Sequence, residues 1–103
     1  MAGDYGFDEQ IHAPTRLRIC GRLRPVDAAE FSVLRLTLEF SEANLSATLR
    51  SFAEIGYVRV TKASSLSRGD QRRTTTVAPT VEGRRAFDGH VAALRLIADS
   101  LGC

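Results

Sequence analysis

The sequence predicts a mostly helical α+β fold in one domain, residues 1–103. Three patterns favour this class. Residues 41–55 form an amphipathic helical pattern, residues 57–62 and 74–78 are rich in β-branched side chains, and residues 80–101 form a long apolar helix. A chain of this length has room for one hydrophobic core, so we expect these elements to pack together.

The composition is that of an ordinary globular protein, with 44% hydrophobic and 25% charged residues. No apolar run approaches the roughly 20 residues that span a bilayer. Residues 1–5 lack the basic and apolar regions of a signal peptide. We therefore expect a cytoplasmic protein without a membrane partner.

The distribution of charge is more informative than the formal net charge of +2. Acidic residues gather within positions 4–9 and 27–42. Basic residues gather in two other blocks, one of Arg16, Arg18, Arg22 and Arg24, and one of Arg59, Lys62, Arg68, Arg72 and Arg73. Such segregation predicts a basic surface on a nearly neutral protein, which is typical of a protein that binds phosphate groups.

The N-terminal quarter of the chain predicts an arm followed by two helices. Residues 1–7 form a loose arm, and residues 8–12 form a short helix that Asp8 caps. Pro14 suits the first turn of a second helix, where its missing amide hydrogen costs nothing, and this helix ends near Pro25. The apolar face of the second helix consists of Leu17, Cys20 and Leu23.

Two short elements precede the amphipathic helix. Residues 26–31 are predicted to be extended, with Phe31 pointing inward. Residues 33–40 are apolar at alternate positions as well as at i+3 and i+4, so their periodicity fits both a strand and a helix. We predict a helix because the break at Phe40 and Ser41 leads directly into the next helix, as in two helices joined by a tight turn.

The helix over residues 41–55 has good caps and two unlike faces. Ser41 is a favourable N-cap, and Gly56 can take the left-handed conformation that ends a helix. The apolar stripe, at i, i+4 and i+7, consists of Leu45, Leu49 and Phe52. The opposite face carries small or hydrogen-bonding residues, namely Ala43, Asn44, Ala47, Thr48, Arg50 and Ser51. Short side chains let a helix approach base edges in the major groove of DNA, although helix propensity and capping also explain them on a surface helix without a ligand.

The C-terminal half predicts a hairpin followed by a long helix. Residues 57–62 and 74–78 are expected to be strands, and residues 64–70 have the composition of a hairpin tip. Thr80 caps the final helix, which runs to about Leu101. Apolar residues spaced by 4, 3, 4 and 3 form a seam along it, namely Phe87, Val91, Leu94, Ala98 and Leu101. In so small a chain a second subunit is a natural partner for this helix.

Three stretches carry a resemblance to a known family. They are residues 12–19, HAPTRLRI; residues 44–49, NLSATL, with Phe52 and Gly56-Tyr57-Val58; and Arg72-Arg73-Thr74 followed by residues 80–87, TVEGRRAF. In this order and spacing, over about residues 8–95, the chain resembles the winged helix family of MarR-like and ArsR-like bacterial transcription regulators. Val81 departs from the pattern, because such proteins often have Pro after the Thr.

The resemblance implies a winged helix-turn-helix fold with a two-stranded wing and a long C-terminal dimerisation helix. It also implies a homodimer that binds double-stranded DNA at a pseudo-palindromic operator. Residues 41–55 would be the recognition helix, and the loop over residues 64–73 would be the wing. The expected major-groove residues are Asn44, Thr48, Arg50 and Ser51; the expected backbone contacts are Ser41 and Lys62; and the wing arginines are Arg68, Arg72 and Arg73.

A metal-responsive or thiol-responsive ArsR-like sensor is one alternative. Metal sites need clustered Cys, His or carboxylate ligands. Cys20 lies alone in an apolar stripe, where packing is favoured over ligation. Asp88 with His90, and Asp99 with Cys103, could supply ligands across a dimer, but their spacing does not require it. We therefore predict no metal and no cofactor, and a free thiol at Cys103 that could form an intersubunit disulfide on oxidation.

Other classes of function receive less support. His12 and His90 have no nucleophile near them in sequence, so we predict no enzyme, with His12 in a packing or helix-start role and His90 exposed or at the dimer seam. A protein-interaction module whose last helix docks a partner without reading bases is the second hypothesis. RNA binding is disfavoured because no exposed aromatic platform is evident. A small-molecule effector could bind between the recognition unit and the dimer helices, but no convergent polar set marks a pocket.

Overall fold

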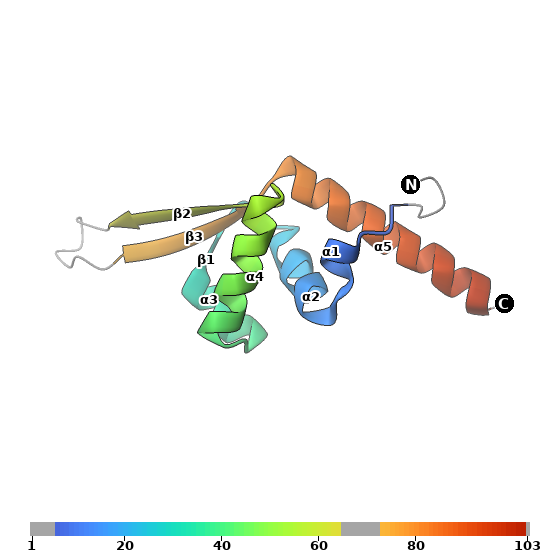
Figure 1. Cartoon of the computed structure of the whole chain (residues 1–103), viewed down its shortest axis with the longest axis horizontal. Helices are drawn as coiled ribbons and strands as arrows, with labels where there is room; N and C mark the ends of the chain where they lie inside the picture. Colours follow the sequence, from blue (N-terminus) through green and yellow to red (C-terminus); the bar gives the residue numbers. More distant parts are fainter. Residues whose placement is uncertain (1–5, 65–72, 103) are drawn as a thin grey trace.

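The structure, a computed structural model, describes residues 6–64 and 73–102. Helices alternate with short strands along the chain, which confirms the predicted mostly helical α+β class and the predicted order of elements (Figure 1). The elements are α1 (Glu9–His12), α2 (Pro14–Leu23), β1 (Ala29–Glu30), α3 (Phe31–Leu38), α4 (Glu42–Glu54), β2 (Val58–Ser64), β3 (Arg73–Pro79) and α5 (Val81–Gly102).

The described strands form one antiparallel sheet in the order β1-β3-β2. Val77 of β3 lies opposite Ala29 on one side and Val60 on the other. Beyond this pairing, β2 and β3 continue as a two-stranded ribbon that points away from the helices at one end of the molecule, while α5 extends from the other end (Figure 1). The molecule is therefore elongated, with extents of 59 × 24 × 21 Å.

The core lies where α1, α2, α3 and α4 meet the root of the ribbon. The predicted apolar stripe of α4 is confirmed, because Leu45, Leu49 and Phe52 are all buried. They pack in one cluster with residues from the other elements, namely Ile11, Ile19, Leu23, Leu34, Val58 and Val77. Burial of this stripe fixes which face of α4 is left to solvent.

The turn between α3 and α4 sets the start of α4. The sequence predicted that α3 runs to Phe40, but it ends at Leu38 because Glu39 adopts a left-handed conformation with φ 58°. The predicted N-cap of α4 is confirmed, because the Ser41 side chain accepts a hydrogen bond from the Asn44 amide at 3.1 Å. At the other end, Gly56 has φ 83°, as its predicted helix-stopping role requires.

The start of α5 is fixed to the end of α4. The Thr80 hydroxyl donates to the Gly56 carbonyl at 2.6 Å and accepts from the Gly83 amide at 3.0 Å, which confirms Thr80 as the cap of the last helix. The Thr80 amide donates to the Tyr57 carbonyl at 3.1 Å. The long helix is thus positioned by the same turn that ends α4.

The N-terminal segment corrects two predictions. Residues 1–5 lie outside the described residues, but Gly6 and Phe7, predicted to belong to a loose arm, pack on α5. Phe7 is half-buried, with its ring centroid 4.8 Å from that of His90. His90 was predicted to be exposed or at the dimer seam; it is wholly buried inside the subunit, because Phe7 and His12 cover it.

Within residues 6–64 and 73–102, no helix has the length and apolar character needed to cross a bilayer.

Candidate nucleic-acid interface

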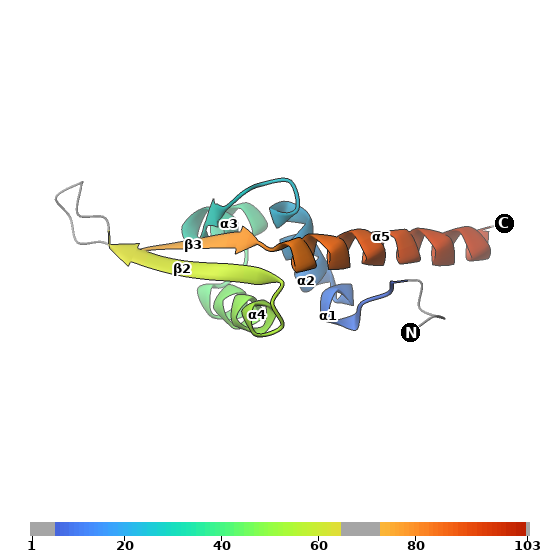
Figure 2. The ribbon, with the colours of Figure 1, turned by 90° about the horizontal axis from the view of Figure 1, so that it is seen from above.

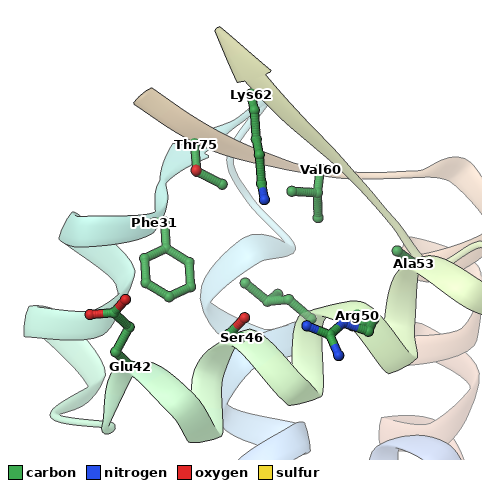
Figure 3. A pocket seen from close by; sticks show the side chains of 9 residues that line it. Phe31, Glu42, Ser46, Arg50, Ala53, Val60, Lys62 and Thr75 are labelled. Atoms are coloured by element: carbon green, nitrogen blue, oxygen red, sulfur yellow. The ribbon is translucent and has the colours of Figure 1, made fainter. Parts of the chain in front are cut away.

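A hollow of about 370 Å³ lies between α4 and the β2–β3 ribbon (Figure 3). From the ribbon, Lys62 reaches toward the helix; from the helix, Ser46 and Arg50 face the same space. The full lining consists of Phe31, Glu42, Ser46, Leu49, Arg50, Ala53, Val60, Lys62 and Thr75. The exposed flank of α4 and one face of the ribbon therefore border a single surface.

The exposed face of α4 is made of short side chains over most of its length. Because Leu45, Leu49 and Phe52 point into the core, the residues between them turn outward. Exposed positions on α4 are Glu42, Ala43, Asn44, Ser46, Ala47, Arg50, Ala53 and Glu54. Most of this face has no long side chain that would keep a duplex at a distance, and Arg50 is the basic group on it.

The structure separates the four predicted major-groove residues. Asn44 and Arg50 are exposed, and Ser51 is half-buried. Thr48 points inward: it is 8% exposed, and its hydroxyl donates to the Asn44 carbonyl at 2.9 Å. A buried, hydrogen-bonded hydroxyl has no surface to offer a base edge, so Thr48 is a packing residue rather than a base-reading one.

Ser46 is a surface residue that the sequence reasoning did not single out. Its signal was present in the spacing, because Ser46 follows Glu42 by four residues and precedes Arg50 by four. These three side chains share the flank of α4 that faces the hollow. Thr48, by contrast, follows Leu45 by three residues and precedes Phe52 by four, which places it on the buried stripe.

Only some of the predicted backbone-contact and wing residues lie within the described structure. Ser41 is exposed at the start of α4. Its hydroxyl oxygen accepts the capping hydrogen bond, and its hydroxyl hydrogen takes no part in that bond. Lys62 is exposed beside the hollow. Arg68 and Arg72 lie outside the described residues, and Arg73 begins β3 opposite Ser64.

The first basic block of the sequence is largely committed to contacts within the subunit. Arg18 donates to the Leu38 carbonyl at 3.4 Å and lies over the Phe40 ring at 5.1 Å. Arg24 forms a bidentate ion pair with Asp88 of α5, in which Nε donates to Oδ1 at 2.8 Å and Nη2 donates to Oδ2 at 2.9 Å. Arg24 thereby holds the pKa of the Asp88 carboxyl below its usual value. These arginines join elements of the fold, so their charges are engaged in contacts within the chain.

The apolar seam predicted on α5 divides into two parts. Phe87 packs against the core of its own subunit, close to Gly21 of α2. Val91 and Leu94 are half-buried, whereas Ala98 and Leu101 are exposed. Two further large apolar residues near Leu101 are exposed, namely Leu96 and Ile97. The C-terminal half of α5 therefore presents an uncovered apolar surface, and Phe87 does not belong to it.

The described residues also bear on a metal site and on an effector pocket. Among the described residues, no three His, Cys, Asp or Glu side chains gather in a way that could hold a metal. Burial raises the pKa of the Cys20 thiol to about 12, so Cys20 is neutral at physiological pH and a poor ligand. Between α2, the ribbon root and α5, the structure leaves a space of about 10 Å³, which holds no more than one water.

The chain is similar to known proteins in sequence and in structure. A family model described as the winged helix DNA-binding domain matches residues 15–98. The chain is similar to the structure of a transcriptional regulator homologue from Pyrococcus horikoshii OT3, with 25% sequence identity, a TM-score of 0.83 and coverage of 93% of this chain and 91% of that one. No curated protein gives a significant match.

Two further solved structures share the fold at lower identity. One is NadR in complex with 4-hydroxyphenylacetate, with 21% identity and a TM-score of 0.66 over 86% of this chain and 60% of that one. The other is a MarR-family transcriptional regulator from Silicibacter pomeroyi, with 20% identity and a TM-score of 0.63 over 86% of this chain and 56% of that one. The chain thus spans less than two thirds of these two proteins.

Proposed function

The chain belongs to the winged helix DNA-binding domain family, and we propose that it is a transcriptional regulator that binds double-stranded DNA sequence-specifically, as a homodimer on a pseudo-palindromic operator. One observation carries the proposal: the short-chained face of α4 and the β2–β3 ribbon border the same hollow, with Arg50 and Lys62 on it (Figure 3). A duplex could therefore meet the helix and the ribbon together.

Base reading is assigned to α4. Arg50 is exposed and can donate two hydrogen bonds to guanine, while Asn44 can pair with adenine. Ser51 and the newly identified Ser46 flank these residues, and a hydroxyl can pair with either kind of edge. Thr48 is left out of the set because it is buried.

Phosphate contacts are assigned to the ends of the interface. Ser41 lies at the N-terminus of α4, where the helix dipole and free amides favour an anion. Lys62 supplies a positive charge from β2. We assign Arg68, Arg72 and Arg73 to the wing, on the sequence argument alone, as contacts to the backbone or the adjacent minor groove.

A second copy of the chain is assigned to the C-terminal half of α5. This half extends beyond the rest of the subunit (Figures 1 and 2). It leaves Leu96, Ile97 and Leu101 exposed, with Leu101 81% exposed. A self-complementary contact between two such helices would cover this surface and place two recognition helices on one face of the DNA.

The experiment that tests the proposal is titration of the full chain with a labelled duplex from the region upstream of its own gene, over a series of salt concentrations. We expect the logarithm of the binding constant to fall linearly with the logarithm of the salt concentration. We also expect weaker binding to random DNA. Absence of binding at low salt, together with recovery of a defined complex with another protein, would favour the interaction-module hypothesis instead.

A further inference from the structure

Asp8 links three parts of the subunit that are far apart in the sequence. Its backbone amide donates to Nδ1 of His90 in α5 at 2.9 Å. Its carboxylate accepts from the Gln10 amide at 2.8 Å, which caps α1, and from the hydroxyl of Tyr57. Tyr57 lies in the turn between α4 and β2, where its own amide donates to the Phe52 carbonyl at 2.9 Å. A single residue therefore connects α5 to the turn between α4 and β2.

His90 is the part of this link that can change its charge. It is wholly buried, and its Nδ1 accepts a hydrogen bond from an amide, so the neutral ring carries its proton on Nε2. Nε2 is buried without a partner in the described structure. A second proton on Nδ1 would face the Asp8 amide hydrogen, so protonation of His90 must break this bond.

The charged and titratable groups around His90 act in opposite directions. From α1, His12 lies with its ring centroid 5.5 Å away and disfavours a second positive charge; the Asp8 carboxylate favours it. Burial, followed by His12, lowers the pKa of His90, and Asp8 only partly offsets this. Next to Asp8, Tyr57 and Cys20 of α2 each have a pKa raised to about 12 and stay neutral, while Glu82 of α5 adds to the shift at Tyr57. His90 is thus the group through which mild acid can change the charge of this cluster.

We propose that Asp8, His90 and Tyr57 form a pH-sensitive joint that fixes α5 relative to α4 and the ribbon, and that protonation of His90 opens it. The effect of this joint on DNA binding rests on the proposed function. A dimer must hold its two recognition helices at the spacing of two half-sites, and a loosened joint no longer sets that spacing. DNA affinity should therefore fall as the solution is acidified.

The test uses two readouts on the full chain between roughly pH 7.5 and pH 5. The first is NMR of the His90 ring and the Asp8 amide. The second is affinity for a duplex that the chain selects from a random DNA pool. In the wild type we expect the Asp8 amide to shift with the same midpoint as His90, and affinity to fall by about tenfold over the same range.

Three variants separate the joint from general effects of pH. His90→Gln keeps a neutral acceptor for the Asp8 amide but cannot titrate, so its affinity should lose this pH dependence. His12→Gln removes the exposed histidine and should keep the fall. Tyr57→Phe keeps the ring and His90 but cuts the link to the turn, so His90 should still titrate while the fall in affinity is lost.

The outcomes distinguish the joint from the proposed function. A fall in His90→Gln or Tyr57→Phe as large as in the wild type would overturn the joint. If no duplex is bound at any pH, the proposed function fails, and the NMR readout alone decides. In that case an Asp8 amide that titrates with His90 supports the joint, and one that does not move rejects it.

Discussion

Gly83 of α5 lies so close to Tyr57 that a Cβ built on Gly83 would be 2.1 Å from the Tyr57 carbonyl oxygen. The contact is with backbone rather than with a flexible side chain, so it cannot be relieved by a rotamer change. Because Tyr57 lies in the turn that follows α4, this contact sets how closely α5 approaches α4.

The first prediction uses this contact. Gly83→Ala should lower the free energy of unfolding by roughly 3 kcal/mol, since the new methyl group must displace backbone. Chemical denaturation followed by circular dichroism measures the change. The control is Gly21→Ala in α2, where the added Cβ would lie 3.5 Å from Phe87, an ordinary contact. It should be stabilising by about 0.5–1 kcal/mol because alanine favours helix. Equal stability of the two variants would contradict the account.

The second prediction concerns the ribbon. Lys62 borders the hollow, whereas Arg59, three residues earlier on β2, lies on the opposite face because side chains alternate along a strand. Lys62→Gln should reduce the slope of log affinity against log salt by about one unit, and Arg59→Gln should leave it unchanged. The slopes come from binding titrations at several salt concentrations. A similar reduction in both variants would mean that the hollow does not define the phosphate contact.

The third prediction separates base reading from packing on α4. Arg50→Ala should cost about 1–3 kcal/mol on the selected site and little on random DNA, because a specific base contact is lost. Thr48→Ala should lower stability by about 1 kcal/mol through its lost hydrogen bond, with sequence preference kept. Competition titrations with selected and random duplexes give both values. Equal losses on both duplexes for Arg50→Ala would reassign Arg50 to the DNA backbone.

The fourth prediction concerns Tyr57 in alkaline solution. Burial and the hydrogen bond to Asp8 raise the pKa of Tyr57 to about 12 from its ordinary value near 10. The unfolded chain therefore loses this proton first, and Tyr57 makes the folded state less stable as the pH rises from about 10 to 12. Tyr57→Phe should lack this contribution, so its unfolding free energy should fall less steeply over that range. Identical slopes in the two proteins would show that Tyr57 is not held protonated by the fold.

The fifth prediction concerns the proposed dimer. Ile97→Glu combined with Leu101→Glu should leave the chain monomeric, because two charges would be buried at the proposed interface. Val81→Glu is the matched control, since Val81 is also exposed on α5 but lies at its first turn. Sedimentation velocity measures the outcome. A dimer that survives the double substitution would place the interface elsewhere.

Local sequence patterns predicted much of the fold. The caps Ser41 and Thr80 and the spacing of Leu45, Leu49 and Phe52 depend on neighbours a few residues away, and all are confirmed. These features fixed the order of the elements and the buried face of α4. They also placed the exposed face that carries Asn44 and Arg50.

Long-range contacts account for what the sequence did not predict. His90 is buried by Phe7, which is more than 80 residues away in the sequence, and no pattern on α5 signals that cover. Arg18 and Arg24 find their partners on α3 and α5 rather than on a ligand, although their charges alone suggested a phosphate surface. The prediction that Thr48 reads bases was wrong, because it used the chemistry of the hydroxyl and not the spacing of the residue. By its spacing Thr48 belongs to the buried stripe of α4.

The central claim is that two copies of α4 and its ribbon read a two-fold symmetric DNA site. Selection of bound sequences from a random double-stranded pool by the full chain tests it most directly. The account predicts one enriched motif with two inverted half-sites about one helical turn apart, lost in Arg50→Ala. Recovery of no enriched sequence at low salt, or of a motif without two-fold symmetry, would contradict it.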